Sequence, residues 1–210
     1  MPNSDRSILR IHSYGGIRAH QVRQFVADVE YAYNGLCGLD ATLARIESGE
    51  RYRRRYFPFP FYPAPIGPMP NLGRDDIEAL VPPRERLIVR AVRLESPGFW
   101  DFLGRTLSLE AINSWLSGRQ ERRENRRQEP HRRRMEDLDY EDRVTEVVVN
   151  RFRAAREMGF EPDDLTPLLG QLVERPLREL ERHQDSGLIE GTEILPPDTE
   201  SPAARDQESD

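Results

Sequence analysis

The chain has 210 residues, enough for one domain of ordinary size with additional terminal segments. Hydrophobic residues make up 37% and charged residues 32% of it, so we expect a modest core, extended charged helices and some disorder. The net charge of -6 argues against a simple nucleic-acid-binding protein, and the single cysteine, Cys37, excludes a disulfide framework and a cysteine-based metal site.

The positive charge of the chain is carried by arginine alone and is unevenly placed. Exclusive use of arginine is typical of a genome that favours arginine codons, so a role in phosphate binding needs local evidence. Residues 119–134 hold eight arginines and three glutamates, whereas residues 179–210 hold ten acidic residues and two arginines. A basic segment within an acidic chain keeps local nucleic-acid binding open.

No segment predicts secretion or a membrane span. The N-terminal residues lack a basic region followed by a long apolar run, so we expect no signal peptide. The longest stretch without charge, residues 56–73, contains six prolines and could not cross a bilayer as a helix. We therefore expect a bacterial cytoplasmic protein that does not bind membranes.

The first 46 residues predict a strand and then a helix. Residues 7–13 alternate apolar and polar side chains, which is typical of a half-buried strand. Apolar residues then recur at spacings of three, four and seven, which predicts an amphipathic helix over residues 22–36. We expect Gly35 and Gly38 to loosen the end of this helix and residues 39–46 to continue it after a kink.

A proline-rich insertion over residues 51–83 follows. Prolines at alternate positions prevent a helix and favour an extended backbone, with one helical turn expected over residues 75–80. The simplest interpretation is that the aromatic side chains of the insertion pack on the domain or on a sister subunit. The alternatives are a segment that docks in a groove of another protein, and a site for single-stranded nucleic acid in which arginines meet phosphates and rings stack on bases.

Residues 87–94 form the next predicted strand, and the sequence after them predicts a helix. Ser96 is a favourable N-cap and Pro97 suits the first helical position, so we expect Ser96-Pro97-Gly98 to end the strand and begin a helix. Residues 99–103 are mainly aromatic and give that helix a large apolar face.

A second helix is expected to lead into a charged segment. Gly104 breaks the preceding helix, and Ser108 caps the next one. Residues 119–136 are predicted to form a charged connecting helix, because glutamates lie three to five residues from arginines and support it through ion pairs. The alternative is an arginine-lined helix that lies on phosphates, although the interleaved glutamates would repel them.

Residues 137–184 predict a helical hairpin with a long first helix and a short, leucine-rich second helix that Pro176 interrupts. Residues 185–210 are acidic and contain three prolines, so we expect this tail to be mostly disordered. Within it, residues 187–195 are apolar enough for a short docking segment.

No catalytic motif is visible. The phosphate-loop and dinucleotide fingerprints and the G-x-S-x-G nucleophile motif are missing from the sequence, and the four histidines are scattered at spacings that define no zinc site. A nucleophile pair of Cys37 and His20 would require the first helix to bend back on itself. We therefore expect no enzymatic activity and no cofactor.

These elements predict an α+β, helix-rich fold. Residues 1–118 hold a small two- or three-stranded sheet built as strand–helix–strand, followed by the charged helix and the C-terminal hairpin. If the two strands are parallel neighbours, the first helix is a right-handed crossover. Two strands make a poor sheet, so the proline-rich insertion or a second subunit should complete it, which predicts a homo-oligomer or a protein partner.

The leading functional hypothesis is a non-catalytic protein-interaction or adaptor module. Its predicted contact residues are the aromatic side chains Phe57, Phe59, Phe61 and Tyr62. The alternative is a nucleic-acid-associated protein that uses two arginine clusters. These clusters are Arg51, Arg53, Arg54 and Arg55 in the insertion, and Arg122, Arg123, Arg126 and Arg127 in the charged helix.

Overall fold

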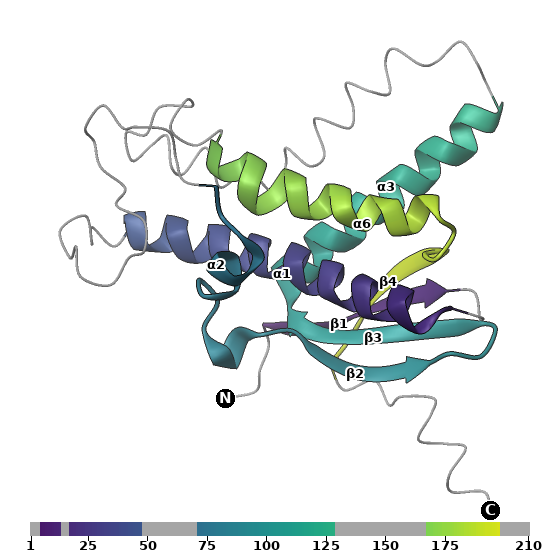
Figure 1. Cartoon of the computed structure of the whole chain (residues 1–210), viewed down its shortest axis with the longest axis horizontal. Coiled ribbons are helices and arrows are strands. Elements are labelled where there is room, and N and C mark those ends of the chain that lie inside the picture. The colour runs from purple at the N-terminus through teal and green to yellow at the C-terminus, as the bar shows by residue number, and fades with distance from the viewer. Residues whose placement is uncertain (1–4, 14–16, 48–70, 129–166, 198–210) are drawn as a thin grey trace, which may run out of the picture.

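The computed structural model describes residues 5–13, 17–47, 71–128 and 167–197 (Figure 1). These residues form an antiparallel sheet and several helices, so the predicted α+β class is confirmed. Within this described part of the chain, the sheet has four strands rather than two or three. The additional strands come from this chain itself and not from the proline-rich insertion or a second subunit.

The described elements begin and end as follows. In chain order they are β1 (Arg6–Ser13), α1 (Ala19–Glu47), α2 (Arg74–Glu78), the short 3-10 helix η2 (Pro83–Glu85), β2 (Ile88–Arg93), β3 (Gly98–Arg105), α3 (Thr106–Gln128), the π-helical turn η3 (Gly170–Glu174), α6 (Arg175–Asp185) and β4 (Gly191–Leu195).

The strands lie in the order β2-β3-β1-β4, and each neighbouring pair is antiparallel. In the chain, β1, α1 and β2 form a β-α-β unit whose two strands are separated by β3. Similarly, β3 and β4 are separated by β1. This is the split β-α-β arrangement of ferredoxin-like sheets, and by itself it assigns no function. The predicted strands at residues 7–13 and 87–94 are therefore not neighbours, because β3 lies between them.

The helix predicted after Ser96-Pro97-Gly98 is wrong. The chain reverses there, with a cis peptide bond between Ser96 and Pro97, and residues 98–105 form β3. Gly98 is required at this turn because an added Cβ would lie only 2.7 Å from the carbonyl oxygen of Arg93. Helix α3 begins at Thr106, so Gly104 belongs to the strand and does not break a helix.

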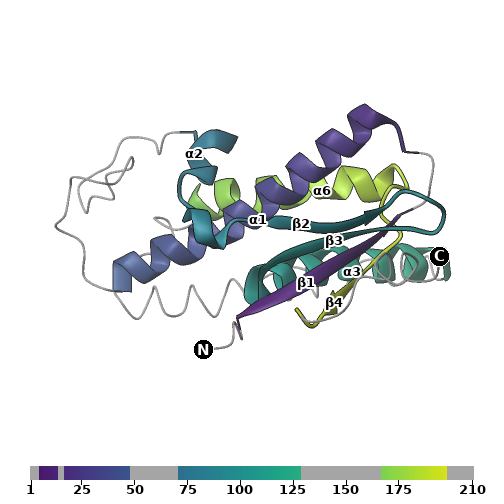
Figure 2. The ribbon, with the colours of Figure 1, turned by 90° about the horizontal axis from the view of Figure 1, so that it is seen from below.

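Residues directly opposite each other on neighbouring strands share a face of the sheet. Leu9 of β1 lies opposite Phe102 of β3, and both belong to the buried core. The alternate residues, such as Arg10 and the opposite Asp101, point to the other side, which we call the open face, although Asp101, Phe99 and Ile8 on this side are buried. Residues of α1, α3 and α6 all contribute to the core, so these helices cover the same face of the sheet (Figure 2).

The predicted apolar stripe of α1 is confirmed as the centre of the core. Phe25 packs edge-on against Trp100 and Phe102 of β3, with ring centroids 5.5 and 6.1 Å apart. Tyr33 is fully buried further along the same stripe. Aromatic rings prefer this T-shaped contact because the positive edge of one ring meets the negative face of the other.

Helix α1 is a single 29-residue helix that includes Gly35 and Gly38, so the predicted loosening at these glycines is wrong. Gly35 instead permits a close approach, because an added Cβ would lie 2.0 Å from the carbonyl oxygen of Leu172 in η3. Leu172 lies four residues before Pro176, and Pro176 has no N–H to donate to the carbonyl of Leu172. The helix widens into the π-turn before Pro176 and continues as α6, so Pro176 does not interrupt it.

Part of the tail that was predicted to be mostly disordered is a strand. Gly191–Leu195 forms β4 and pairs with β1 along the edge opposite β2. Ile194 packs against the core from the helix side, which explains why this acidic segment docks. After β4, the chain continues to the open face, where the carbonyl of Pro197 accepts a hydrogen bond from Arg90 of β2.

Candidate functional site

The predicted contact residues are not tested by the structure. The four aromatic residues of the insertion, and its four arginines, lie outside the described residues. They are Phe57, Phe59, Phe61 and Tyr62, with Arg51, Arg53, Arg54 and Arg55. The other predicted arginines lie in α3, and they are Arg122, Arg123, Arg126 and Arg127.

The outer strand β2 is the most distinctive surface feature of the described residues. Among the described residues, five large hydrophobic side chains are strongly exposed, and four of them belong to β2 or follow it directly. They are Ile88 (46% exposed), Val89 (45%), Val92 (39%) and Leu94 (55%); the fifth is Leu107 of α3 (47%). Adjacent apolar side chains on one border of a sheet are typical of a contact surface, whereas scattered ones are ordinary.

Strand β2 also has a free backbone edge within the described part of the chain, because only β3 pairs with it (Figure 1). Every second residue of such a strand directs its N–H and C=O groups outward, where another strand can pair with them. The pairing between β2 and β3 shifts between Val89 and Ala91, so Arg90 forms a bulge. Bulges and charged residues limit indiscriminate pairing at an edge.

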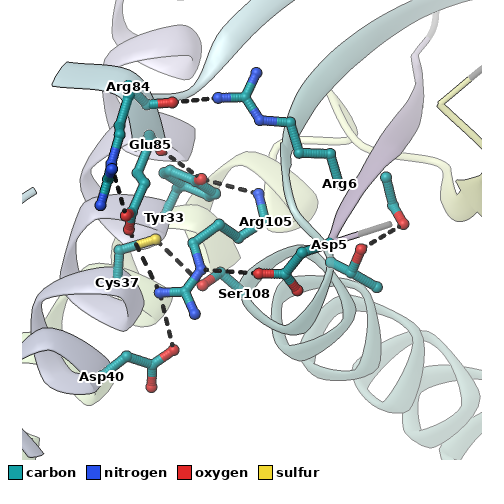
Figure 3. A network of polar contacts seen from close by, with 11 residues as sticks. Asp5, Arg6, Tyr33, Cys37, Asp40, Arg84, Glu85, Arg105 and Ser108 are labelled. Atoms are coloured by element: carbon teal, nitrogen blue, oxygen red, sulfur yellow. Dashed lines mark hydrogen bonds and ion pairs between the residues drawn. The ribbon is translucent and has the colours of Figure 1, made fainter. Parts of the chain in front are cut away.

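A polar network fixes the approach to β2 (Figure 3). The hydroxyl of Tyr33 donates to the carbonyl of Glu85 at 2.7 Å and accepts from the backbone N–H of Arg105 at 2.9 Å. The guanidinium of Arg105 lies 3.6 Å from the carboxylate of Glu85 and 3.7 Å from that of Asp40. These contacts tie α1 and β3 to the segment just before β2, so this edge is held in place by buried partners.

The cysteine in this network is not placed for catalysis. Cys37 is 2% exposed, and its Sγ lies 3.3 Å from Oγ of Ser108. Burial raises the pKa of its thiol, which disfavours the reactive thiolate. His20 is exposed on the same continuous helix and lies about 25 Å from Cys37 along the helix axis. The structure therefore excludes a nucleophile pair of these two residues.

A second polar cluster joins α1, α2 and α6. The Oδ2 atom of the buried Asp28 lies 2.7 Å from Nε2 of His183, and Asp28 also accepts a hydrogen bond from Arg74. Burial by itself would raise the pKa of the Asp28 carboxyl. The hydrogen bonds from His183 and Arg74 outweigh the effect of burial, so the pKa of Asp28 is lowered overall. Arg74 also pairs with Glu179. The cluster is satisfied internally, and its chemistry is that of a bridge between helices.

The open face carries a third cluster, at the centre of the sheet. Arg10 binds Asp101 through two hydrogen bonds of 2.7 and 2.8 Å, and its guanidinium lies 4.5 Å from the centroid of the Phe99 ring. His12 lies 3.1 Å from the carboxylate of Glu193. Because Arg10 covers Phe99, this aromatic ring is not available to stack on a base.

A shallow hollow of about 320 Å³ lies along η3 and α6. Its lining alternates arginines with glutamates, and it includes Arg178 and Glu174, which pair at 3.3 Å. Ligand sites are usually lined mainly by apolar side chains with a few polar groups. We therefore interpret this hollow as the solvated face of a charged helix.

Sequence reasoning found β2 but not its position at the border of the sheet. The local signal for an exposed edge is the combination of valines with arginines in residues 88–93. The pair of Asp28 and His183 was missed because the two residues are 155 positions apart. An acidic residue inside the apolar stripe of α1 was the only local indication that Asp28 needs a buried partner.

Among the described residues, no helix is long and apolar enough to cross a membrane. In the same part of the chain, no group of three or more histidine, cysteine, aspartate or glutamate side chains could hold a metal ion. No family model, curated protein or solved structure matches this chain.

Proposed function

We propose that the protein is a non-catalytic protein-interaction module that binds an extended segment of a partner protein along the outer edge of β2. The observation that carries this proposal is the concentration of exposed apolar side chains at Ile88, Val89, Val92 and Leu94, on and directly after a strand whose outer edge is unpaired within the described residues. An added strand would gain main-chain hydrogen bonds from β2 and side-chain contacts from its valines.

The internal contacts of the other polar groups support this proposal over an enzymatic one. Cys37 is buried, and His183 is engaged with Asp28. The insertion residues Phe57, Phe59, Phe61 and Tyr62 remain predicted contacts of the same kind, because aromatic side chains contribute much of the binding energy at protein interfaces.

The test compares tagged protein with two surface variants in affinity capture from the source cells, with and without nuclease. The edge variant carries Val89→Lys and Val92→Lys, since lysine on an outer strand opposes pairing. The matched control is Leu107→Lys, whose side chain is equally exposed on α3. We expect wild type and control to retain one partner protein that the edge variant loses. The same partners bound by all three proteins would contradict the proposal.

Nucleic-acid binding is the second candidate. The helical backbone of α3 extends through Gln128, so Arg122 and Arg126, like Arg123 and Arg127, are one turn apart. Affinity for a mixed-sequence duplex or single strand should then fall steeply with salt. Glutamate at all four positions should abolish it. No binding at low salt, or a partner that survives nuclease treatment, would argue for the edge of β2 instead.

A further inference from the structure

The two sides of β2 differ in chemistry, which restricts what can pair with its outer edge. Val89 lies opposite Phe102 and Val92 lies opposite Trp100, so both valines point to the side of the sheet that carries the helices. Arg93 lies opposite Phe99, on the same side as Asp101, and therefore points to the open face.

On the helix side, this edge presents apolar surface. Val89 and Val92 remain 45% and 39% exposed although they border the core, so the described helices cover them only in part. Val22 and Val26 of α1 are also only partly buried against the core. A neighbouring strand would therefore bury apolar side chains on this side and gain free energy from the area removed from water.

On the open side, the same edge carries the basic side chains of Arg90 and Arg93, together with the exposed apolar side chain of Ile88 at its start. The bulged Arg90 reaches the carbonyl of Pro197, a neutral acceptor, and within the described residues it has no carboxylate partner. Arg93 meets Glu95 at 3.8 Å, but Glu95 is itself strongly exposed, so this pair is weak. Just before the strand, the exposed Arg84 shares the carboxylate of Glu85 with Arg105. Within the described residues, carboxylates therefore neutralise only part of the positive charge of this edge.

We infer that the occupant of this edge is an extended segment of a partner protein in which apolar residues alternate with carboxylates. Successive side chains of a strand point to opposite faces. The apolar residues would pack beside Val89 and Val92, and the carboxylates would meet Arg90 and Arg93. This inference rests on the proposed function and defines the chemistry of the partner.

A second copy of this chain fits less well. If two β2 strands paired, each would bring Arg90 and Arg93 to the open side of the other. Like charges placed side by side on neighbouring strands are destabilising. Opposite charges attract each other across adjacent strands, so an acidic neighbouring strand binds this edge more favourably than a basic one.

The test uses four dye-labelled octapeptides with the full chain. The first alternates valine and glutamate, and the second alternates valine and lysine. The third and fourth are N-methylated forms of the valine–glutamate peptide, one blocking the valine amides and one the glutamate amides. Binding is measured by fluorescence anisotropy, and protection of the amides of β2 is measured by hydrogen exchange.

We expect the valine–glutamate peptide to bind about tenfold more tightly than the valine–lysine peptide, because two charge pairs change from favourable to unfavourable. It should also slow hydrogen exchange in β2, and one of its N-methylated forms should fail to bind because its hydrogen bonds to the edge are blocked. Arg93→Glu alone should reduce the preference for glutamate, and Arg90→Glu together with Arg93→Glu should reverse it. Because both side chains are exposed, these variants are expected to fold.

The possible failures are distinct. If neither peptide protects β2, the edge does not accept a strand and the proposed function itself fails. If both peptides protect it equally, strand addition stands and the inferred acidic partner is wrong. If β2 is already protected without peptide and the protein has twice the monomer mass, the occupant is a second copy, which also overturns the inference.

Discussion

The contact between α1 and η3 gives the sharpest test of the fold. Gly35→Ala places a methyl group 2.0 Å from the carbonyl oxygen of Leu172, although Cβ atoms in proteins essentially never approach another atom within 3.0 Å. The obstructing oxygen belongs to the backbone of Leu172, so α1 and η3 must move apart. Overpacking of this kind costs about 1–3 kcal/mol, whereas replacing glycine by alanine inside a helix stabilises it by about 1 kcal/mol.

For Gly35→Ala the steric cost should dominate, because a rigid carbonyl cannot move aside, and we expect a net loss of stability of up to about 2 kcal/mol. The matched control is Gly38→Ala on the same helix. There the added Cβ would lie 3.1 Å from Cδ1 of Leu80, a flexible side chain that can move by a few tenths of an ångström. The higher helix propensity of alanine should then determine the result, and the free energy of unfolding of Gly38→Ala should rise by up to about 1 kcal/mol.

Urea unfolding followed by circular dichroism measures both variants. The midpoint should fall for Gly35→Ala and remain or rise for Gly38→Ala, with similar slopes, which indicates a change in stability rather than in compactness. If Gly35→Ala were as stable as wild type, or if both variants lost stability equally, the close packing of α1 on η3 would be refuted.

Three further predictions follow from buried polar groups. The pKa of Asp28 is lowered by folding, so its stabilising contribution is present above the ordinary value of 3.8 and is lost as the pH falls through the folded-state pKa. Asp28→Asn should therefore be less stable than wild type near neutrality, with a gap that narrows in acid; a constant gap across a series of unfolding curves would contradict this. Tyr33→Phe leaves the N–H of Arg105 without its acceptor and should cost about 1–3 kcal/mol by urea unfolding, so an unchanged midpoint would count against the network. The thiol of Cys37, buried and with a raised pKa, should react with a thiol reagent only as fast as the protein opens, and rapid modification of the native protein would disprove its burial.

Local periodicity was sufficient for two elements. The spacing of three and four predicted helix α1, and residues of the predicted stripe, such as Phe25 and Val29, are buried in the core. Alternation in residues 7–13 predicted β1, in which Leu9 and Ile11 belong to the core. Burial extends beyond these faces, because residues 31–39 of α1 are all buried and Ile8 of β1 is buried on the other side of the sheet.

The strand β3 could not be recognised in this way. It lies inside the sheet, and its side chains are buried on both faces, so residues 99–103 show no alternation. The signals in Ser96-Pro97-Gly98 fit a helix start as well as a turn. Pairing with β1 decides between them, and that pairing joins residues more than 80 positions apart.

The candidate binding edge at β2 was likewise only partly predictable from the sequence. The sequence by itself indicated a strand over residues 87–94 in which arginines stand between apolar residues, because β-branched side chains favour an extended, half-buried backbone. Only the tertiary structure decided that this strand is the outer one, that its valines border the helices and that its arginines lie on the open face. These properties depend on the pairing of β3 with β1 and β2. That pairing is determined by contacts between residues far apart in the chain.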